Sequence, residues 1–317
     1  MAPSLFKSVA AAVLSLAACS AHAVGLLVPA YFYPSFDPAQ SQWDEMTAAL
    51  AQGASITAIM NVNNGPGGAP NSDYLAAVQS FRAAGGRVLG YVYTCYGNHQ
   101  CAAGLPATRS VDDVLADVQR YAQWYPVDGI FLDEMSNQTA ALPFYQQVSH
   151  AVRGAHPDWQ LFGNPGTAAP ADYLAFIDTI VTVERGTGSY DGIATEPWMH
   201  TAPASRQAHL HYNVSDTSSM LMLLAEAVQR HAGYVYITND RYTPGNPAEP
   251  NPWDTLPGYW SEEVAAVAAV PEPHAGALLA AALAALGIVR LRKVMQRSAA
   301  RSALGTYRQR CAARRHA

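Results

Sequence analysis

The feature that most constrains the fold is an alternation of short apolar segments with amphipathic ones along residues 24–269. The apolar segments are continuous rather than alternating with polar residues, which is typical of parallel strands covered on both faces. Ser110, followed three residues later by Asp113, is typical of a helix start. No helix is predicted between residues 186 and 205. The predicted strands are 25–32, 56–62, 87–94, 129–132, 160–164, 179–185, 207–214 and 234–239, and the predicted helices are 43–52, 74–84, 110–124, 140–155, 170–176 and 218–231.

Eight such repeats in about 250 residues predict an α/β protein with a single (β/α)₈ barrel of the TIM type. The alternative is a doubly wound sheet, but eight strands without a glycine-rich phosphate loop favour the barrel. Polar or aromatic residues follow each predicted strand. In a barrel the carboxyl ends of the strands surround one mouth, so a functional site is expected there, although each residue taken singly is also typical of turns.

Two adjacent carboxylates, Asp133 and Glu134, follow the buried strand 129–132. Burying carboxylates costs free energy, which indicates a function at this point. Glu184 lies near the end of the sixth strand, and strands four and six are both even-numbered, so Asp133 and Glu184 are expected in one layer across the mouth. Glycoside hydrolysis commonly uses two carboxyl groups that flank the bond to be cut.

In an enzyme of this kind Asp133 would be the nucleophile and Glu184 the acid/base, whose pKa must be raised to hold a proton near neutrality. Glu134 is expected to position or tune one of them. Successive strand residues face opposite sides, so Asp133 and Glu134 both point inward only if the strand has already ended. The alternative is that the two residues cap a loop through backbone hydrogen bonds.

Candidates for substrate binding are rings on which a pyranose can stack and amides that hydrogen-bond to its hydroxyl groups. Aromatic residues at such positions more often belong to the core. The candidates near the mouth are Tyr31, Tyr91, Tyr93, Asn61, Asn164 and His211.

The pair His209 and His211 supports a rival hypothesis. Residues two apart on a strand share a face, and with Asp240 they could hold a metal, which would make the protein a metal-dependent hydrolase or polysaccharide deacetylase. A His-x-His pair is common by chance, and no third histidine falls at a convincing position. We expect no cofactor and no resident metal.

Charge is distributed unevenly along the chain. Nine of the 19 Lys and Arg residues lie between residues 290 and 315, so residues 24–270 hold 9 basic and 23 acidic residues, a formal charge of −14. An acidic body argues against a nucleic-acid partner and for a neutral or cationic one. The alternative explanation is that the acidity only keeps an exported domain soluble.

Residues 1–23 are typical of a secretory signal peptide, with Lys7, an apolar stretch at 9–18 and Ala21-His22-Ala23 as the cleavage site. The alternative is a lipoprotein signal, because Leu-Ala-Ala-Cys at 16–19 resembles a lipobox. We favour cleavage after Ala23, since lipidation of Cys19 would leave almost no tether before the first strand.

Export permits disulfides. Cys95 and Cys101 are predicted to form one that closes a small loop, and a metal clip is disfavoured because no second cysteine pair accompanies them. Cys311, in the tail, would be left over.

The C-terminal segment 270–293 combines Pro271-Glu272-Pro273, an apolar run at 275–289 and the basic cluster 290–293. In this order it resembles the PEP-CTERM sorting signal of exopolysaccharide-producing Gram-negative bacteria, which implies a sorting protease that removes the tail. The run is shorter than the roughly 20 residues of a comfortable membrane span, so a transient inner-membrane contact is expected. A basic tail, 294–317, departs from such signals, which usually end soon after the cluster. The alternative is an ordinary single-span anchor.

Seven motifs in order, over roughly residues 25–260, resemble the spherulation-specific family 4 (spherulin-4-like) proteins. The family includes fungal glycoside hydrolases that cut galactosaminogalactan, an α-linked polymer of galactose and N-acetylgalactosamine. The resemblance implies a (β/α)₈ barrel with acidic residues in its mouth, and by motif position it carries over to Asp133, Glu134 and Glu184. The motifs are LVPAYFYP at 27–34, Asn61 with GPG at 65–67, GYVYT at 90–94, WY at 124–125, DGIFLDE at 128–134, NPGT at 164–167 and VE at 183–184.

The resulting interpretation is an exported glycoside hydrolase of the cell envelope or extracellular matrix. It would act on an exopolysaccharide, with an α-linked polymer containing N-acetylgalactosamine or galactosamine as the substrate that the resemblance suggests. The expected partners are the polysaccharide, the export machinery and the sorting protease. Two alternatives stay open: a non-catalytic surface or matrix protein that binds polysaccharide, and the metal-dependent enzyme built on His209 and His211.

Overall fold

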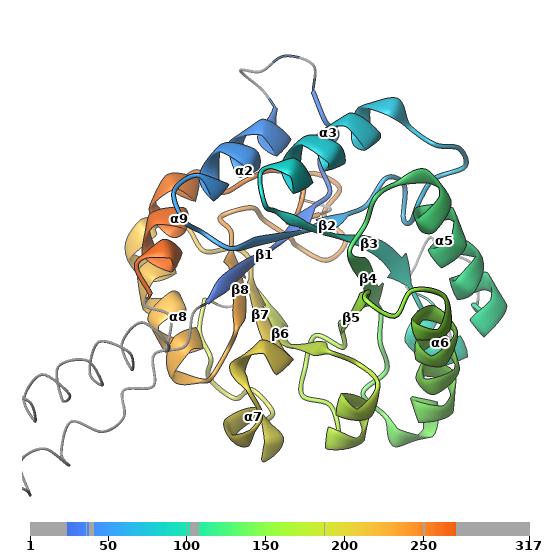
Figure 1. The fold of residues 1–317 in the computed structure, drawn as a ribbon. Coiled ribbons are helices and arrows are strands. Elements are labelled where there is room, and N and C mark those ends of the chain that lie inside the picture. The colour runs from blue at the N-terminus through green and yellow to red at the C-terminus, as the bar shows by residue number, and fades with distance from the viewer. Residues whose placement is uncertain are drawn as a thin grey trace, which may run out of the picture. The chain divides into compact units, whose positions relative to one another are not determined.

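Eight parallel strands close into one barrel, which confirms the predicted fold (Figure 1). The computed structural model describes residues 24–35, 37, 41–99, 101, 108–186, 188–249 and 251–270. Strands follow one another around the barrel in chain order, and their side chains form the buried core together with the inner faces of the helices. The strands are β1 Gly25–Ala30, β2 Ile56–Met60, β3 Arg87–Tyr93, β4 Gly129–Asp133, β5 Gln160–Gly163, β6 Thr179–Arg185, β7 Gln207–His211 and β8 Tyr234–Ile237.

Helices lie outside the barrel and cover its strands (Figure 1). The predicted start of α5 is confirmed: Ser110 Oγ accepts from the backbone N–H of Asp113, and the Asp113 carboxylate accepts from the backbone N–H of Ser110. The main helices are α2 Gln42–Leu50, α3 Ser72–Ala83, α5 Val111–Trp124, α6 Leu142–Ala155, α8 Thr217–Gln229 and α9 Trp260–Ala268.

The structure departs from the predictions mainly at the mouth. Several strands end earlier than predicted, because the chain leaves the ladder to form mouth loops; β1 ends at Ala30 and β7 at His211. The sixth repeat contains only a four-residue helix, α7 Trp198–Thr201, and Trp198 Nε1 anchors it by donating to the carbonyl of Ala169 (2.8 Å). The short segment α4 Cys95–Asn98 and helix α9 were not predicted.

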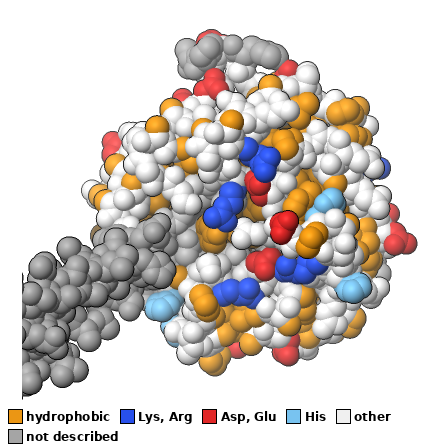
Figure 2. Space-filling view, viewed as in Figure 1, with side chains coloured by type: hydrophobic (Ala, Val, Ile, Leu, Met, Phe, Trp, Pro, Cys, Tyr) orange, Lys and Arg blue, Asp and Glu red, His pale blue; other side chains and the backbone are white. Residues whose placement is uncertain are grey.

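One polar motif occurs twice where strands begin. Asp128 precedes β4, pairs with Arg82 of α3 and accepts from the backbone N–H of Val88 in β3. Asp178 precedes β6, pairs with Arg153 of α6 and likewise accepts from a backbone N–H of β5. Figure 2 shows basic and acidic side chains interleaved near the centre of the face turned toward the viewer. The Arg82–Asp128 and Arg153–Asp178 pairs tie helix ends to strand starts, and the opposite ends of the strands are free to form the site.

The barrel closes weakly between its first and last strands. β1 and β8 pair only at Gly25–Tyr234 and Leu26–Val235. Above this point the backbone N–H of Ile237 donates instead to Glu263 Oε1 of α9 (2.9 Å), and Glu263 is fully buried. Helix α9 therefore supplies a hydrogen-bond acceptor to β8 next to this seam.

The predicted signal peptide, the sorting segment apart from Val270, and the basic tail lie outside the described residues, as do Cys19 and Cys311. Within the part of the chain that the structure describes, we find no helix with both the length and the apolar character needed to cross a membrane.

Candidate active site

Two carboxylates and one amide form the centre of the site. Asp133 ends β4, Glu184 lies near the end of β6, and Asn164 directly follows the intervening β5. Asn164 Nδ2 donates to both acids, to Asp133 Oδ1 at 2.8 Å and to Glu184 Oε2 at 2.6 Å. Asn164 Oδ1 accepts from the backbone N–H of Gly166 at 2.9 Å, which fixes the orientation of the amide. The structure thus brings the two predicted acids to one shared donor.

The chain turns sharply after Asp133 because Glu134 adopts a left-handed conformation, with φ of 47°. Strand alternation ends at this turn, and Asp133 and Glu134 both line the same pocket. Two hydrogen bonds hold the turn: Thr94 Oγ1 donates to the carbonyl of Glu134 (2.8 Å), and the N–H of Met135 donates to the carbonyl of Asn164 (2.9 Å). Asp133 and Glu134 were expected to face the mouth together only if the strand ended between them. The turn at Glu134 ends it there.

The electrostatics distinguish the two acids. Burial, followed by the charge of Asp133, raises the pKa of Glu184 to about 7. Burial also raises the pKa of Asp133, but hydrogen bonds from the Tyr91 hydroxyl (2.7 Å), the backbone N–H of Glu134 and the Asn164 amide act in the opposite direction. The arrangement therefore favours a proton on Glu184 and a charge on Asp133.

A pocket of about 410 Å³ lies over these residues. Aromatic rings form much of its remaining wall: Tyr96 after β3, Tyr212 after β7, and Tyr242 and Trp253 in the loop after β8. Tyr212 meets Tyr242 and Trp253 edge-on, with ring centroids 5.9 and 5.7 Å apart. The lining residues are Tyr96, Asp133, Glu134, Asn164, Pro165, Gly166, Glu184, Tyr212, Tyr242, Asn251, Pro252 and Trp253.

The loop after β8 is held in place by polar side chains. Asp240 Oδ2 accepts from both the N–H and the hydroxyl of Thr255. Asn213, which has φ of 59°, accepts from the N–H of Tyr242 (3.0 Å), and Asn239 accepts from the N–H of Gly258 (2.6 Å). This loop therefore presents a defined wall to the pocket.

Three predicted stacking residues lie elsewhere. Tyr91 is buried below the acids and donates its hydroxyl to Asp133. Tyr31 packs edge-on against Tyr91, with centroids 5.4 Å apart, and its pKa is raised by burial and by the charges of Asp133 and Glu184. Tyr93 is buried with the Arg109 guanidinium 4.3 Å above its ring. None of the three rings lines the described pocket, and the structure gives each of them a hydrogen-bonding or packing partner instead.

Asn61 has a structural role. Its side-chain oxygen accepts from the N–H of Gly65 (3.0 Å), and its carbonyl accepts from the Tyr74 hydroxyl (3.3 Å). The residue organises the loop after β2 and does not line the pocket. The structure therefore shows a turn-forming role for Asn61, and its contact with sugar hydroxyls stays a prediction.

The histidine pair lies outside the mouth. His209 and His211 are completely buried, and the ring of Tyr190 packs against both. Burial lowers the pKa of His209 to about 3 and of His211 to about 4, so both rings are neutral. The Asp240 carboxylate is bound to Thr255, and among the described residues these histidines join no cluster of three potential metal ligands. His211 is thus not a pocket residue, and the proposed metal set does not assemble.

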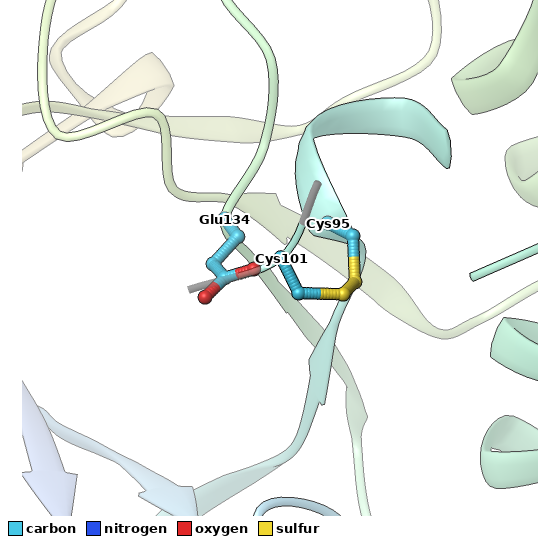
Figure 3. Close-up of side chains that lie close together, drawn as sticks. All are labelled: Cys95, Cys101 and Glu134. Atoms are coloured by element: carbon cyan, nitrogen blue, oxygen red, sulfur yellow. A yellow bond between two sulfur atoms is a disulfide. The ribbon is translucent and has the colours of Figure 1, made fainter. Parts of the chain in front are cut away.

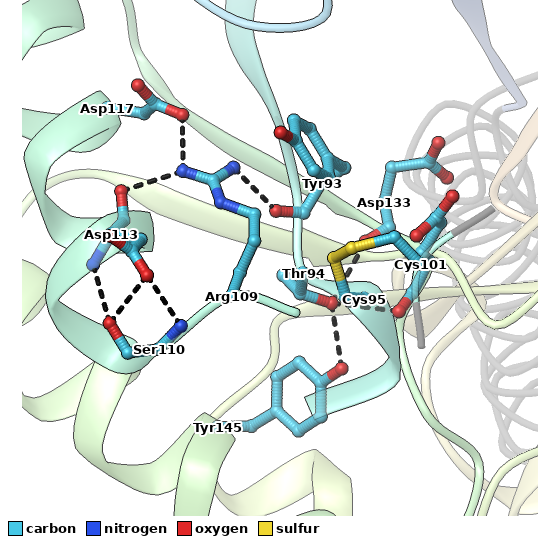
Figure 4. Close-up of a disulfide and its surroundings, with 11 residues drawn as sticks. Tyr93, Thr94, Cys95, Cys101, Arg109, Ser110, Asp113, Asp117, Asp133 and Tyr145 are labelled. Carbon is cyan, nitrogen blue, oxygen red and sulfur yellow. Dashed lines mark hydrogen bonds and ion pairs between the residues drawn. A yellow bond between two sulfur atoms is a disulfide. The ribbon is translucent and has the colours of Figure 1, made fainter. Parts of the chain in front are cut away.

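The predicted disulfide between Cys95 and Cys101 is confirmed. It lies beside Glu134, as Figure 3 shows, and potential ligand atoms of these three residues are within 4.8 Å of one another. With the two sulfurs bonded to each other, neither is a thiolate ligand. Figure 4 shows the surrounding network, in which Arg109 bonds to the carbonyl of Tyr93 (2.9 Å).

Sequence reasoning missed most of the aromatic wall. Tyr212 lies inside the predicted strand 207–214 and directly follows the observed β7, so an earlier predicted strand end would have placed it at the mouth with the acids. Tyr242 and Trp253 lie five and sixteen residues after the end of β8. No strand-end rule reaches that far into a loop, so only the folded loop reveals them.

Comparison with known proteins agrees with this architecture. The model of a family described as spherulation-specific family 4 matches residues 25–267. Spherulin-4 of Physarum polycephalum is 33% identical over 266 residues, which cover 80% of this chain and 73% of that protein. The crystal structure of Aspergillus clavatus Sph3 in complex with GalNAc matches with a TM-score of 0.62 and 22% identity, over 79% of this chain and 99% of that chain. The likeness to Sph3 shows a shared barrel fold.

Proposed function

The chain belongs to spherulation-specific family 4, and from that premise we propose that it is an exported glycoside hydrolase that cuts an exopolysaccharide. The observation that carries the proposal is the Asn164 amide that holds Asp133 and Glu184 at the floor of an aromatic-walled pocket. An α-linked polymer containing N-acetylgalactosamine or galactosamine is the proposed substrate, and its support is the GalNAc bound by the structurally similar Sph3.

In the proposed mechanism Asp133 attacks the anomeric carbon while Glu184 gives its proton to the departing glycosidic oxygen. Glu184 then takes a proton from water, which hydrolyses the glycosyl–enzyme ester and restores both residues. The pKa of about 7 for Glu184 suits both the acid and the base step. Glu134, adjacent in the pocket, positions the sugar or tunes Asp133.

The spacing of the acids favours retention of the anomeric configuration. Both acids accept from one nitrogen, so the two accepting oxygens are at most about 5.4 Å apart. Retaining enzymes have their carboxyl groups about 5–5.5 Å apart, whereas inverting enzymes need about 6.5–9.5 Å to admit a water. Proton NMR of the first product released will show the anomer.

The function is tested by product release from α-linked amino-sugar polysaccharides and from the host's own exopolysaccharide. We expect Asp133→Asn and Glu184→Gln to lower the rate by about 10²–10⁴-fold. Asp172→Asn, which changes an exposed acid on the outside, is the matched control. Wild-type rates in both site variants would refute the mechanism, and binding without product by the wild type would favour a binding protein.

Localisation and processing are part of the proposal. We propose that residues 1–23 are removed on export, that 24–269 form the working barrel and that 270–293 are a sorting segment. The Cys95–Cys101 disulfide supports export, because disulfides persist in oxidising compartments. N-terminal sequencing and mass spectrometry of the protein recovered from its host will show both cleavage points, and a lipid on Cys19 would refute the signal-peptide assignment.

A further inference from the structure

The segment after β3 has an unusual backbone beside the candidate active site. Cys95, Tyr96 and Gly97 all have positive φ angles, of 47°, 54° and 79°. Residues with a β-carbon adopt this left-handed conformation at an energetic cost, so two of them in succession must be held by their surroundings. The disulfide from Cys95 to Cys101 spans this turn.

The left-handed turn is joined directly to the acidic end of β4. The N–H of Thr94 donates to the carbonyl of Asp133 (2.9 Å), and the N–H of Tyr96 donates to the carbonyl of Glu134 (2.7 Å). Thr94 Oγ1 donates to the Glu134 carbonyl and also contacts the Tyr145 hydroxyl (2.8 Å), which is visible in Figure 4. The turn thus fixes the backbone from which both carboxylates project.

The same turn supplies part of the pocket wall. Tyr96 is 42% exposed and lines the pocket beside Glu134, although its main chain is held by the turn. The turn is also packed from behind, because a β-carbon on Gly97 would lie 3.0 Å from Ala141 and 3.3 Å from the Tyr145 ring. Any relaxation of the turn therefore moves the Tyr96 ring. It also moves the Tyr96 N–H, which holds the carbonyl of Glu134.

We propose that the Cys95–Cys101 disulfide is a positioning element of the active site, which holds Tyr96 and Glu134 in place and makes activity depend on the redox state. This inference rests on the proposed hydrolase function for its catalytic part only. Opening the disulfide with a dithiol proceeds by thiolate attack on one sulfur and release through a mixed disulfide. The two electrons pass from the dithiol, which becomes a cyclic disulfide, to Cys95 and Cys101, which become thiols.

The first test is hydrogen exchange followed by mass spectrometry on the full chain. The comparison is between the protein with the disulfide and the variant Cys95→Ser/Cys101→Ser, with Asp172→Asn as the control that keeps the disulfide. We expect faster exchange at residues 94–99 and 133–136 and unchanged exchange in α8. Unchanged exchange at 94–99 and 133–136, or faster exchange everywhere, overturns the proposal.

The second test separates positioning from mere stabilisation through kcat and KM, measured well below the melting temperature. We expect loss of the disulfide to lower kcat at least tenfold and to raise KM, and Tyr96→Ala to reproduce only the rise in KM. Reoxidation of dithiothreitol-treated wild type should restore both parameters. A local exchange change with unaltered kinetics overturns the catalytic part. If no form of the protein hydrolyses any polysaccharide, the hydrolase function fails, while the exchange result alone decides whether the disulfide positions the turn.

Discussion

At the scale of single residues, Asn164 links the two acids more closely than any other side chain of the site. Its amide donates to both carboxylates, and each of these bonds lowers the pKa of its acceptor. The same amide is oriented by the N–H of Gly166. Asn164 therefore bridges Asp133 and Glu184 and partly offsets the rise in pKa that burial causes in each.

We predict that the wild-type rate falls as the pH rises through about 7, because Glu184 then loses the proton that it must donate. Asn164→Ala removes a donor that stabilises the charged forms, so the pKa of Glu184 rises and the falling limb moves to higher pH. The loss of hydrogen bonds to charged groups should lower kcat about 10- to 100-fold. The pH profile of kcat/KM measures the shift of the falling limb, and kcat at saturating substrate measures the loss of rate.

Asn61→Ala is the control for this profile, since its amide serves a turn outside the pocket. The rising and falling limbs of the pH profile of Asn61→Ala should coincide with those of the wild type. A profile of Asn164→Ala with unshifted limbs would show that the amide does not tune the acids.

The acids were predictable from sequence, whereas the residues around them were only partly so. Asp133, Glu134 and Glu184 follow from a simple rule, that carboxylates at the ends of buried strands need a purpose. The rule does not say which way a tyrosine on a strand points in a barrel of unknown register. The sequence therefore indicates Tyr91 and Tyr93 as stacking rings, although the Tyr91 hydroxyl donates to Asp133 and the Tyr93 ring packs beneath Arg109.

At the scale of elements, the strands were predictable because continuous apolar runs have few other uses in a chain of this length. β6, Thr179–Arg185, matches its prediction at both ends. The four-residue α7 and the left-handed turn after β3 were not predictable, because tertiary contacts stabilise them: Trp198 with Ala169, and Tyr96 with Glu134. Local helix and strand propensities do not depend on such distant partners, so they cannot predict these two segments.

Arg109 attaches the start of α5 to the end of β3, and we predict that it is important for stability. Its guanidinium is buried, pairs with Asp117 (2.6 Å) and donates to the carbonyl of Tyr93. Arg109→Met should lower the free energy of unfolding by about 3 kcal/mol, the low end for a broken buried pair, because Arg120 still faces Asp117. Urea denaturation measures this change.

Arg120→Met is the matched variant, because Arg120 binds the same carboxylate but is half exposed. It should cost less than about 1 kcal/mol. Equal costs for the two variants would contradict the importance assigned to burial.

Glu263 of α9 should make the barrel less stable as the pH rises. Burial raises its pKa from 4.5 to about 8, so the folded protein keeps a proton that the unfolded chain releases. The contribution of protonated Glu263 to the free energy of unfolding is fully present below pH 4.5, and it is lost as the pH rises toward 8. Glu263→Gln keeps the acceptor for the Ile237 N–H and should remove this loss, which amounts to roughly a few kcal/mol at pH 8.

Thermal or urea unfolding at pH 5 and pH 8 tests this prediction. The wild type should be less stable at pH 8 than the Glu263→Gln variant, and the two should converge near pH 5. Glu262→Gln, an exposed neighbour on the same helix, should behave like the wild type. Parallel pH curves for wild type and Glu263→Gln would contradict the raised pKa.

At the scale of the whole molecule, one physical arrangement produces both the fold and the site. Closing eight parallel strands brings every strand end to one mouth, so pocket residues that follow β3 to β8 meet although they are spread over 157 residues of sequence, from 96 to 253. The barrel and its acidic centre were predictable for this reason. The pocket wall depends on the long loop after β8, whose course is set by side-chain hydrogen bonds that no periodic pattern records.

The charge of the barrel supplies a last prediction about its substrate. Residues 24–270 carry a formal charge of −14, and the described lining of the pocket includes three carboxylates and no basic residue. Such a body attracts a partly deacetylated, cationic polysaccharide, and salt weakens this attraction because the Debye length falls from about 30 Å at 0.01 M to about 10 Å at 0.1 M.

We therefore expect the KM for a partly deacetylated polymer to rise several-fold between 0.01 and 0.1 M salt, at a pH where its amino groups are protonated. The fully N-acetylated polymer of the same length is the control, and its KM should stay constant because it carries no charge. A KM that is independent of salt for both polymers would show that the acidity has no part in substrate binding and is explained by solubility alone.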